Sequence, residues 1–192
     1  MEPVKSRSTS VAYRRQRQIE DCLFENLLHT PYASISVADI CRQVGISRKA
    51  FYNYYHDKDA CLCAIIDRVL HDTLLRTSQD VPDNASPLEA CTVLLERWKE
   101  QKPLFDIIVH NNLFLFFLAR STHYILSEDH GILDLLSTSE VKFAADILCC
   151  YVSRQVTLMM QWYSRGFDTP AEEMARKYLR LVHFPLIQPP EE

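Results

Sequence analysis

The stretch ISVADICRQVGISRKAFYNYYHDKDACL, residues 35–62, decides the fold, because one of the chain's three glycines stands here between two short helical patterns. Ser36 precedes Asp39 by three positions, which is close to a capping box. Apolar residues then recur at helical spacing, at Val37, Ile40, Cys41 and Val44. Gly45 is placed to end this helix in the left-handed conformation, and Ser47 can cap the next one. The stretch therefore predicts a helix-turn-helix.

Helical patterns continue on both sides of this motif. Asp57 can cap a helix that extends to about Thr77, and the polar segment SQDVPDNASP at residues 78–87 marks the clearest boundary. The other helices are predicted over residues 13–28, 87–101, 103–111, 113–126, 140–165 and 170–181. No segment alternates convincingly over the length of a strand, so the sequence predicts an all-α protein.

The charge of the chain is divided unevenly along its length. Residues 1–58 carry nine Lys or Arg and six Asp or Glu, a net charge of +3, whereas the whole chain has a formal net charge of −4. Residues 59–192 therefore carry a net charge of −7. This division is typical of a basic nucleic-acid-binding region attached to an acidic body.

Arg48 and Lys49 stand in the first turn of the second motif helix, where the helix dipole makes positive charge unfavourable by about 0.3–1 kcal/mol each. Their placement is explained if this helix end enters a DNA major groove, where Arg and Lys donate to guanine O6 and N7. Tyr52, one turn later, can reach a base or a phosphate. Donors suited to phosphate oxygens follow at Asn53, Tyr54 and Lys58. Any one of these residues fits a solvated charge or a core aromatic equally well, and only the combination favours DNA.

The same stretch resembles the DNA-binding domain of the tetracycline-repressor (TetR) family. Gly45-Ile46-Ser47, the run Phe51–Tyr55 and Lys58 occupy the positions of that family's pattern, and the likeness covers the chain up to about Ile65. Two positions depart from it, since Lys49 stands where Gly or Pro is frequent and Ala50 where Thr is frequent. These departures bear on which operator sequence is bound, and not on DNA binding itself.

The resemblance implies roles for individual residues. It implies base contacts by Arg48, Lys49 and Tyr52. It implies phosphate contacts by Ser36, Ser47, Asn53, Tyr54 and Lys58. It also implies a homodimer that binds double-stranded DNA, formed through the last two helices, and an inducer pocket among the C-terminal helices.

The sequence of the C-terminal part allows both the dimer and the pocket. The helix predicted over residues 140–165 is apolar on several faces, so it needs cover on more than one side. The dimer candidates are Val152, Val156, Met159 and Tyr178. The pocket candidates are Trp98, His110, Phe114, Phe117, Tyr124, Met159, Trp162 and Tyr163. Aromatic and methionine residues at helical spacing are more often plain core, and His110 can equally lie on the surface.

Other classes of protein find little support in the sequence. The chain has no Gly-rich phosphate loop, nucleophile elbow or His/Glu metal motif, so we expect no enzyme, cofactor or metal site. Asp106 and His110 are four residues apart and resemble an acid/base pair, although surface pairing is the commoner explanation. The seven cysteines, an odd number, indicate reduced thiols, mostly in the core, in a cytoplasmic protein. The basic N-terminus lacks the apolar run of a signal peptide or a membrane anchor.

We therefore expect four parts: a flexible basic arm (1–12), a helix-turn-helix DNA-binding domain (13–60), a connecting helix (61–80) and a helical regulatory and dimerisation domain (81–192). The expected function is that of a transcriptional regulator, most often a repressor in this family, that leaves a palindromic operator when a small molecule binds. A helical regulator controlled by a protein partner, or an activator without a small-molecule inducer, is the alternative.

Overall fold

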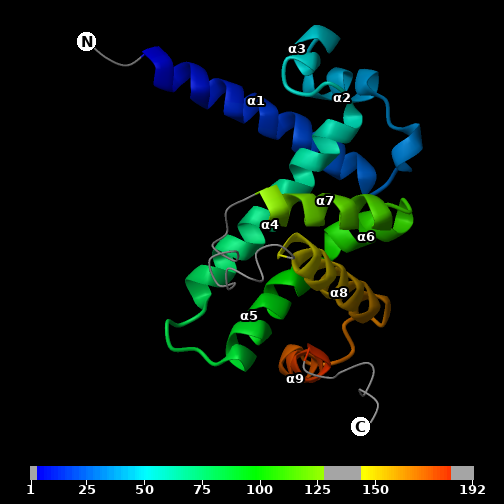
Figure 1. Ribbon diagram of the computed structural model, residues 1–192. Coiled ribbons are helices and arrows are strands. Elements are labelled where there is room, and N and C mark those ends of the chain that lie inside the picture. Colours follow the sequence, from blue (N-terminus) through cyan, green and yellow to red (C-terminus); the bar gives the residue numbers. More distant parts are fainter. Residues whose placement is uncertain (1–3, 128–143, 183–192) are drawn as a thin grey trace, which may run out of the picture. The chain divides into compact units, whose positions relative to one another are not determined.

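The computed structural model describes residues 4–127 and 144–182, and in these ranges it contains helices and no strand (Figure 1). The all-α prediction is confirmed for this part of the chain. The helices are α1 (Val4–Leu27), the 3-10 helix η1 (Tyr32–Ser34), α2 (Val37–Val44), α3 (Arg48–Tyr52), α4 (Lys58–Asp80), α5 (Pro87–Lys99), α6 (Lys102–His110), α7 (Phe114–Ser127), α8 (Ala144–Ser164) and α9 (Ala171–Val182).

The helices fall into two compact units. Unit 1 comprises Met1–Val69 and Pro103–Ser153, and unit 2 comprises Leu70–Lys102 and Arg154–Glu192. The long helices α4 and α8 each run from one unit into the other. This grouping by contacts divides the chain differently from the four functional parts expected from the sequence, and those parts stay a prediction.

The core of unit 1 begins with the apolar face of α1. Ile19 and Leu23 are fully buried and Leu27 is nearly so, as their spacing of four residues predicts. They belong to a core that also takes Ile40 and Cys41 from α2, Phe51 from α3, and Leu62, Ile65 and Ile66 from α4. One short helix-turn-helix thus shares its core with two long helices.

The turn between α2 and α3 has the local chemistry that the sequence predicts. The Ser36 hydroxyl accepts from the Asp39 amide and the Asp39 carboxylate accepts from the Ser36 amide, which completes a capping box. Gly45 ends α2 with φ of +70°, in the left-handed region. Ser47 then caps α3 by accepting from the Ala50 amide at 3.1 Å.

The first helix begins earlier than the sequence predicts. A start at residue 13 is wrong, because α1 already begins at Val4, inside the segment expected to be a flexible arm. Residues 4–12 contain no proline or glycine, and adding residues to an existing helix costs little once its first turn has formed. The predicted helix therefore continues backward along the chain.

Unit 2 is built on the packing of α9 against α5. Ser86 and Glu89 form a capping box at the start of α5. The turn from α8 to α9 uses two consecutive left-handed residues, Gly166 with φ of +69° and Phe167 with φ of +56°. The Phe167 ring meets the buried Trp162 ring edge-on at 4.9 Å, and Trp162 Nε1 donates to the Thr169 carbonyl at 3.0 Å. Trp162 therefore closes this turn.

The long apolar helix near the C-terminus was predicted to be buried in the protein and not to cross a membrane. Its described part, α8, exposes Asp146, Thr157 and Gln161 to solvent. Within residues 4–127 and 144–182, no helix combines the length and the apolar character needed to span a bilayer. Residues 140–143 of the predicted helix lie outside the described residues.

Candidate nucleic-acid interface

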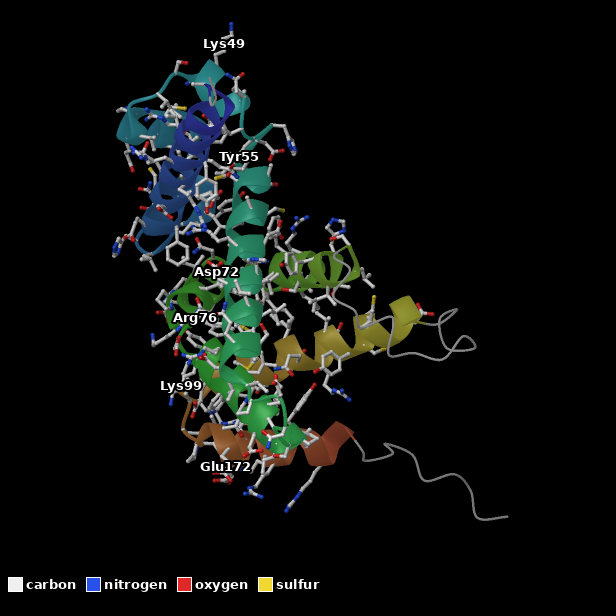
Figure 2. The ribbon with its side chains drawn as sticks, turned by 90° about the vertical axis from the view of Figure 1, so that its left-hand side faces the viewer. Lys49, Tyr55, Asp72, Arg76, Lys99 and Glu172 are labelled. Carbon is white, nitrogen blue, oxygen red and sulfur yellow. The ribbon has the colours of Figure 1, made fainter. Side chains whose placement is uncertain are left out.

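The short helix α3 holds two cations at its exposed N-terminal end. Arg48 and Lys49 are both exposed, and neither forms a hydrogen bond or ion pair with any residue that the structure describes. Figure 2 shows Lys49 projecting outward at one end of unit 1. The charges predicted to face DNA are therefore available to an external partner.

The remaining residues of α3 separate an inward side from an outward side. Phe51 is fully buried and anchors the helix, whereas Tyr52 is 53% exposed. The two rings meet edge-on with centroids 5.6 Å apart. Phe51 therefore packs against one side of Tyr52, and the rest of the Tyr52 side chain remains exposed to solvent, as a DNA contact requires.

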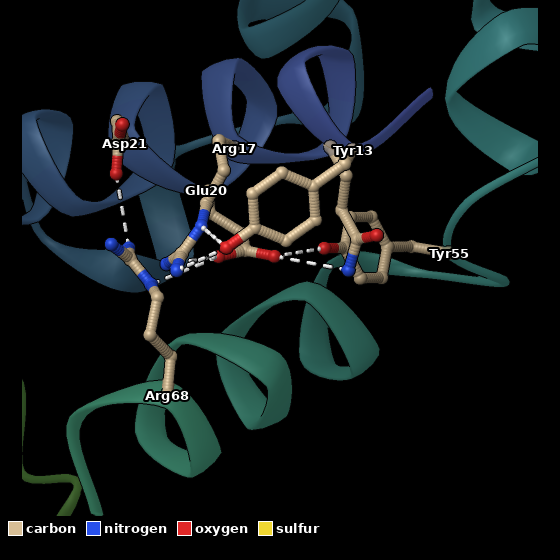
Figure 3. A network of polar contacts seen from close by, with 7 residues as sticks. Tyr13, Arg17, Glu20, Asp21, Tyr55 and Arg68 are labelled. Carbon is tan, nitrogen blue, oxygen red and sulfur yellow. Dashed lines mark hydrogen bonds and ion pairs between the residues drawn. The ribbon is translucent and has the colours of Figure 1, made fainter. Parts of the chain in front are cut away.

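The end of α3 is tied to the rest of unit 1 through Tyr55 (Figure 3). The Tyr55 hydroxyl is directed to the buried carboxylate of Glu20 in α1, with a donor–acceptor distance of 2.6 Å. Arg68 of α4 places Nε 3.0 Å from the other oxygen of Glu20 and also binds Asp21 at 3.0 Å. Burial, and then the hydrogen bond to Glu20, raise the pKa of Tyr55, so its proton is held for this bond. The network fixes α3 against α1 and α4.

Sequence reasoning missed this network, although one signal for it was present. Glu20 lies three and seven residues before Leu23 and Leu27, on the apolar side of α1. A carboxylate there must find partners or be neutralised, since an unpaired buried charge is costly. Glu20 could have been marked as a buried polar centre, but its partners Tyr55 and Arg68 lie far along the chain and had no local signature.

Lys58 has a structural role next to the interface. Its ammonium donates to the carbonyls of Tyr32 at 2.5 Å and Ile35 at 2.6 Å, and it lies 3.9 Å from the centroid of the Tyr32 ring. Burial lowers the pKa of Lys58. Two of its three donors thus hold the loop before α2, and a phosphate contact by Lys58 stays a prediction that must use the third.

The other predicted phosphate contacts differ in what they can still donate. The Ser36 hydroxyl donates to Asp39 Oδ2 at 2.5 Å, so its one hydrogen is used inside the capping box. The Ser47 hydroxyl accepts from the Ala50 amide and keeps its hydrogen for another partner. Asn53 is exposed at the C-terminal cap of α3 and Tyr54 is half-buried. Ser47 and Asn53 are therefore the better placed of these four.

A second set of bonds connects the elements around the motif, α1, η1 and α4, to α7 and to Asn111 at the end of α6 inside unit 1. Asn111 accepts from the Tyr32 amide at 2.6 Å and donates to the carbonyls of Leu27 and Ile107. The Arg120 guanidinium of α7 makes a two-pronged contact with the Asp67 carboxylate of α4. No pattern in the sequence marks the pairs between distant elements, because their partners are not neighbours along the chain.

The predicted pocket residues are distributed over both units. His110, Phe114, Phe117 and Tyr124 belong to unit 1, and Trp98, Met159, Trp162 and Tyr163 to unit 2. Phe117, Tyr124, Met159, Trp98 and Trp162 are buried, Phe114 and Tyr163 are half-buried, and His110 is exposed. The His110 Nδ1 bonds the backbone carbonyl of Asp106 at 2.7 Å. A pocket formed by these residues stays a prediction.

The predicted dimer residues are already buried in the single chain. Val152 and Val156 are each 7% exposed, Met159 is 2% and Tyr178 is 3% exposed. Side chains this well covered offer little area to a partner. Their part in a dimer interface stays a prediction, and any direct contact surface on α8 and α9 must include their exposed neighbours.

The cysteines were predicted to be reduced. All seven are free of disulfides, and Cys41 and Cys61 are buried, whereas Cys150 is exposed. Burial raises the pKa of the thiols of Cys41 and Cys61. Most of these thiols are packed or half-packed, and Cys150 departs from the expected core position.

Comparison with known proteins identifies the motif and the fold. Residues 25–65 match the family described as bacterial regulatory proteins, tetR family. A segment of 61 residues is 44% identical to the HTH-type transcriptional regulator EthR of Mycobacterium tuberculosis, covering 30% of this chain and 28% of that protein. The chain thus matches little more than a quarter of this curated relative's length.

Two solved structures share the fold over almost the whole chain. The TetR transcriptional regulator from Streptococcus agalactiae 2603V has a TM-score of 0.61 at 17% identity, covering 91% of this chain and 97% of that chain. FadR of Thermus thermophilus, a TetR family transcriptional repressor solved with lauroyl-CoA, has a TM-score of 0.61 at 16% identity, covering 92% and 98%. Residues 25–65 thus carry the helix-turn-helix sequence of the tetR family of bacterial regulatory proteins, and the chain shares its helical fold with regulators of that family.

Proposed function

We propose that the chain is a DNA-binding transcriptional regulator that acts in the cytoplasm. It binds a palindromic operator as a homodimer, represses transcription there, and leaves the DNA when a small molecule binds to its C-terminal helices. The family match and the exposed basic end of α3 support the DNA-binding part of this proposal. The homodimer, the repression and the effector are expectations that follow from the family.

The single observation that carries DNA binding is the pair Arg48 and Lys49. Both stand in the first turn of α3, against the helix dipole, and neither has a hydrogen-bond or ion-pair partner among the described residues. Local stability does not account for them, because a short capped helix gains nothing from positive charge at its start. A negatively charged partner does account for them, and in a helix-turn-helix that partner is the major groove of DNA.

The test of DNA binding is the affinity for a palindrome from the DNA flanking the chain's own gene, compared with random DNA of equal length. We expect Arg48→Ala to weaken operator binding about 10- to 100-fold, since a good base contact contributes about 1–3 kcal/mol. Lys99→Ala is the control, because Lys99 is also an exposed cation but lies on α5, outside the helix-turn-helix and the last two helices. If the wild-type chain binds the palindrome no better than random DNA, a specific regulator is excluded.

The effector is tested by thermal unfolding in the presence of candidate ligands. Lauroyl-CoA, which is bound in the Thermus thermophilus FadR structure, is a rational first compound. A ligand that binds only the folded chain raises its melting temperature, and one that prefers the DNA-free state also weakens operator binding. A broad metabolite screen without any thermal shift favours the alternative, a regulator that answers to a protein partner.

The direction of regulation is tested by transcription in vitro from a promoter that carries the operator. Repression predicts fewer transcripts when the chain is added, and recovery when the effector follows. A rise in transcripts identifies an activator instead.

A further inference from the structure

Residues 11–14 of α1 form a stretch of helix in which no side chain is buried. Val11, Ala12, Tyr13 and Arg14 are four consecutive residues, and all are exposed. At about 100° per residue they span most of the helix circumference, so this part of α1 buries no face in the chain. Packing in the core of unit 1 therefore does not explain why this part of the chain is helical.

The charge of this segment is entirely positive. Residues 3–18 contain Lys5, Arg7, Arg14, Arg15 and Arg17, and no Asp or Glu. A helix that serves only solubility usually mixes both signs, which also stabilises it through pairs one turn apart. Here the first turns of α1 carry positive charge at the end of the helix where the dipole disfavours it. Arg48 and Lys49 in α3 are placed in the same unfavourable way.

The basic side chains of this segment differ from most others in the chain in whether they have a partner within the protein. Beyond Val11, the Lys and Arg side chains that the structure describes bind carboxylates, carbonyls or aromatic rings, with five exceptions. The exceptions are Arg14, Arg15, Arg48, Lys49 and Arg180. Four of the five therefore lie on α1 and α3 of unit 1. Arg17 is not among them, since it binds the Tyr13 hydroxyl and lies 3.8 Å from Glu20.

The geometry of unit 1 directs this segment toward the side of α2 and α3. Cys22 and Asn26 of α1 both contact Gln43 of α2, at 3.2 and 2.8 Å. Arg15 precedes Cys22 by seven residues, or two turns, so it lies on the same face of α1 and about 10 Å further along the axis. Figure 1 and Figure 2 show the N-terminal end of α1 at about the height of α3, and in Figure 1 the two are separated sideways.

We propose that the part of α1 that carries the exposed Arg14 and the half-buried Arg15 is a second DNA-binding surface, which contacts backbone phosphates outside the bases reached by α3. The proposal rests on the proposed DNA-binding function. Phosphate is the matching partner because the segment offers positive charge without a shaped pocket or a base-reading turn. Such contacts add affinity to every sequence alike.

The test is the dependence of DNA affinity on salt, measured with operator and random duplexes between about 50 and 200 mM KCl. Each lost phosphate contact lowers the slope of log K against log salt by about 0.9. Arg14→Gln/Arg15→Gln removes two contacts per subunit and four per homodimer, so it is expected to lower the slope by about 3.6. Both duplexes lose affinity by the same factor, which leaves the ratio of operator to random binding unchanged. Arg14→Lys/Arg15→Lys, which keeps the charges, is expected to retain the slope.

A control is Arg76→Gln/Lys99→Gln, which removes the same charge from exposed residues of α4 and α5, outside the last two helices, and is expected to keep the wild-type slope. An unchanged slope in Arg14→Gln/Arg15→Gln overturns the proposal, as does an equal fall in the control. A loss of binding to vesicles containing phosphatidylserine, with the DNA slope intact, assigns the surface to lipid and overturns it too. Failure of the proposed function has a different sign: the wild-type chain then binds operator and random DNA with equal affinity. Even in that case, the salt slope measured on random DNA still tests the proposed role of α1.

Discussion

At the residue scale, the Tyr55 hydroxyl is the link between the end of α3 and the buried carboxylate of Glu20. Tyr55→Phe removes this donor without changing the shape of the ring. We expect the free energy of unfolding to fall by about 1–3 kcal/mol, because a buried charged acceptor loses a hydrogen bond. Urea unfolding followed by circular dichroism measures the change. Tyr54→Phe, at a half-buried residue whose hydroxyl bonds no described residue, is the control and is expected to stay within about 0.5 kcal/mol of wild type.

Cys61 gives a second prediction at this scale, on the response to alkaline pH. The thiol is fully buried, and burial raises its pKa above the ordinary 9.0. Below about pH 9 both the folded and the unfolded chain hold this proton. Above it the unfolded chain releases the proton and the folded chain keeps it, so stability is lost as pH rises, by about 1.4 kcal/mol per pH unit for one such group.

The measurement for Cys61 is the slope of unfolding free energy against pH between about pH 9 and 10.5. Cys61→Ala is expected to make this slope shallower even though its stability at pH 7 is lower, because the slope reports the proton and not the packing. Cys150→Ala, at an exposed thiol, is the control with wild-type slope. Equal slopes in wild type and Cys61→Ala contradict the prediction.

At the scale of elements, the turn at Gly45 decides the orientation of α3. A Cβ added at Gly45 meets nothing within 4 Å, so the cost of a substitution is that of the left-handed backbone alone. Gly45→Ala is expected to lower the free energy of unfolding by about 1–2 kcal/mol. Gly45→Asn is expected to lose less, since asparagine tolerates this conformation better than alanine. The midpoints of urea unfolding measure both variants. If Gly45→Asn lowers the free energy of unfolding as much as Gly45→Ala does, space and not the left-handed φ limits this position.

The same elements show what a sequence can predict and where it stops. The caps at Ser36 and Ser47 and the stop at Gly45 follow from near neighbours in the chain, and all three were predicted correctly. The start of α1 was missed because the polar sequence before Tyr13 offers no clear signal of a helix. The partners that Glu20 finds in Tyr55 and Arg68, and the carbonyls that Lys58 binds, were missed because they belong to other elements, far along the chain. Local pattern determines the caps, whereas tertiary contact determines the polar network.

At the scale of the whole molecule, the charge of the chain restricts how it meets DNA. Residues 1–58 carry a net charge of +3 and residues 59–192 one of −7, so the acidic remainder is repelled by phosphate while the basic part is attracted. One copy of α3, with its 5 residues, contacts only a few base pairs. Specific binding therefore needs a second copy, and the proposed homodimer supplies it at a fixed distance.

This distance gives a prediction for the operator. In a two-fold symmetric dimer, two copies of α3 contact half-sites about 34–36 Å apart, which is one turn of DNA. Five base pairs inserted between the half-sites turn one of them to the opposite side of the duplex. We expect affinity to fall by about 100-fold or more, since only one subunit can then bind at a time. The same five base pairs added outside the half-sites are the control and leave the affinity unchanged. Affinity that does not depend on the insertion, together with one chain per duplex in sedimentation, would show that the chain binds half-sites as a monomer.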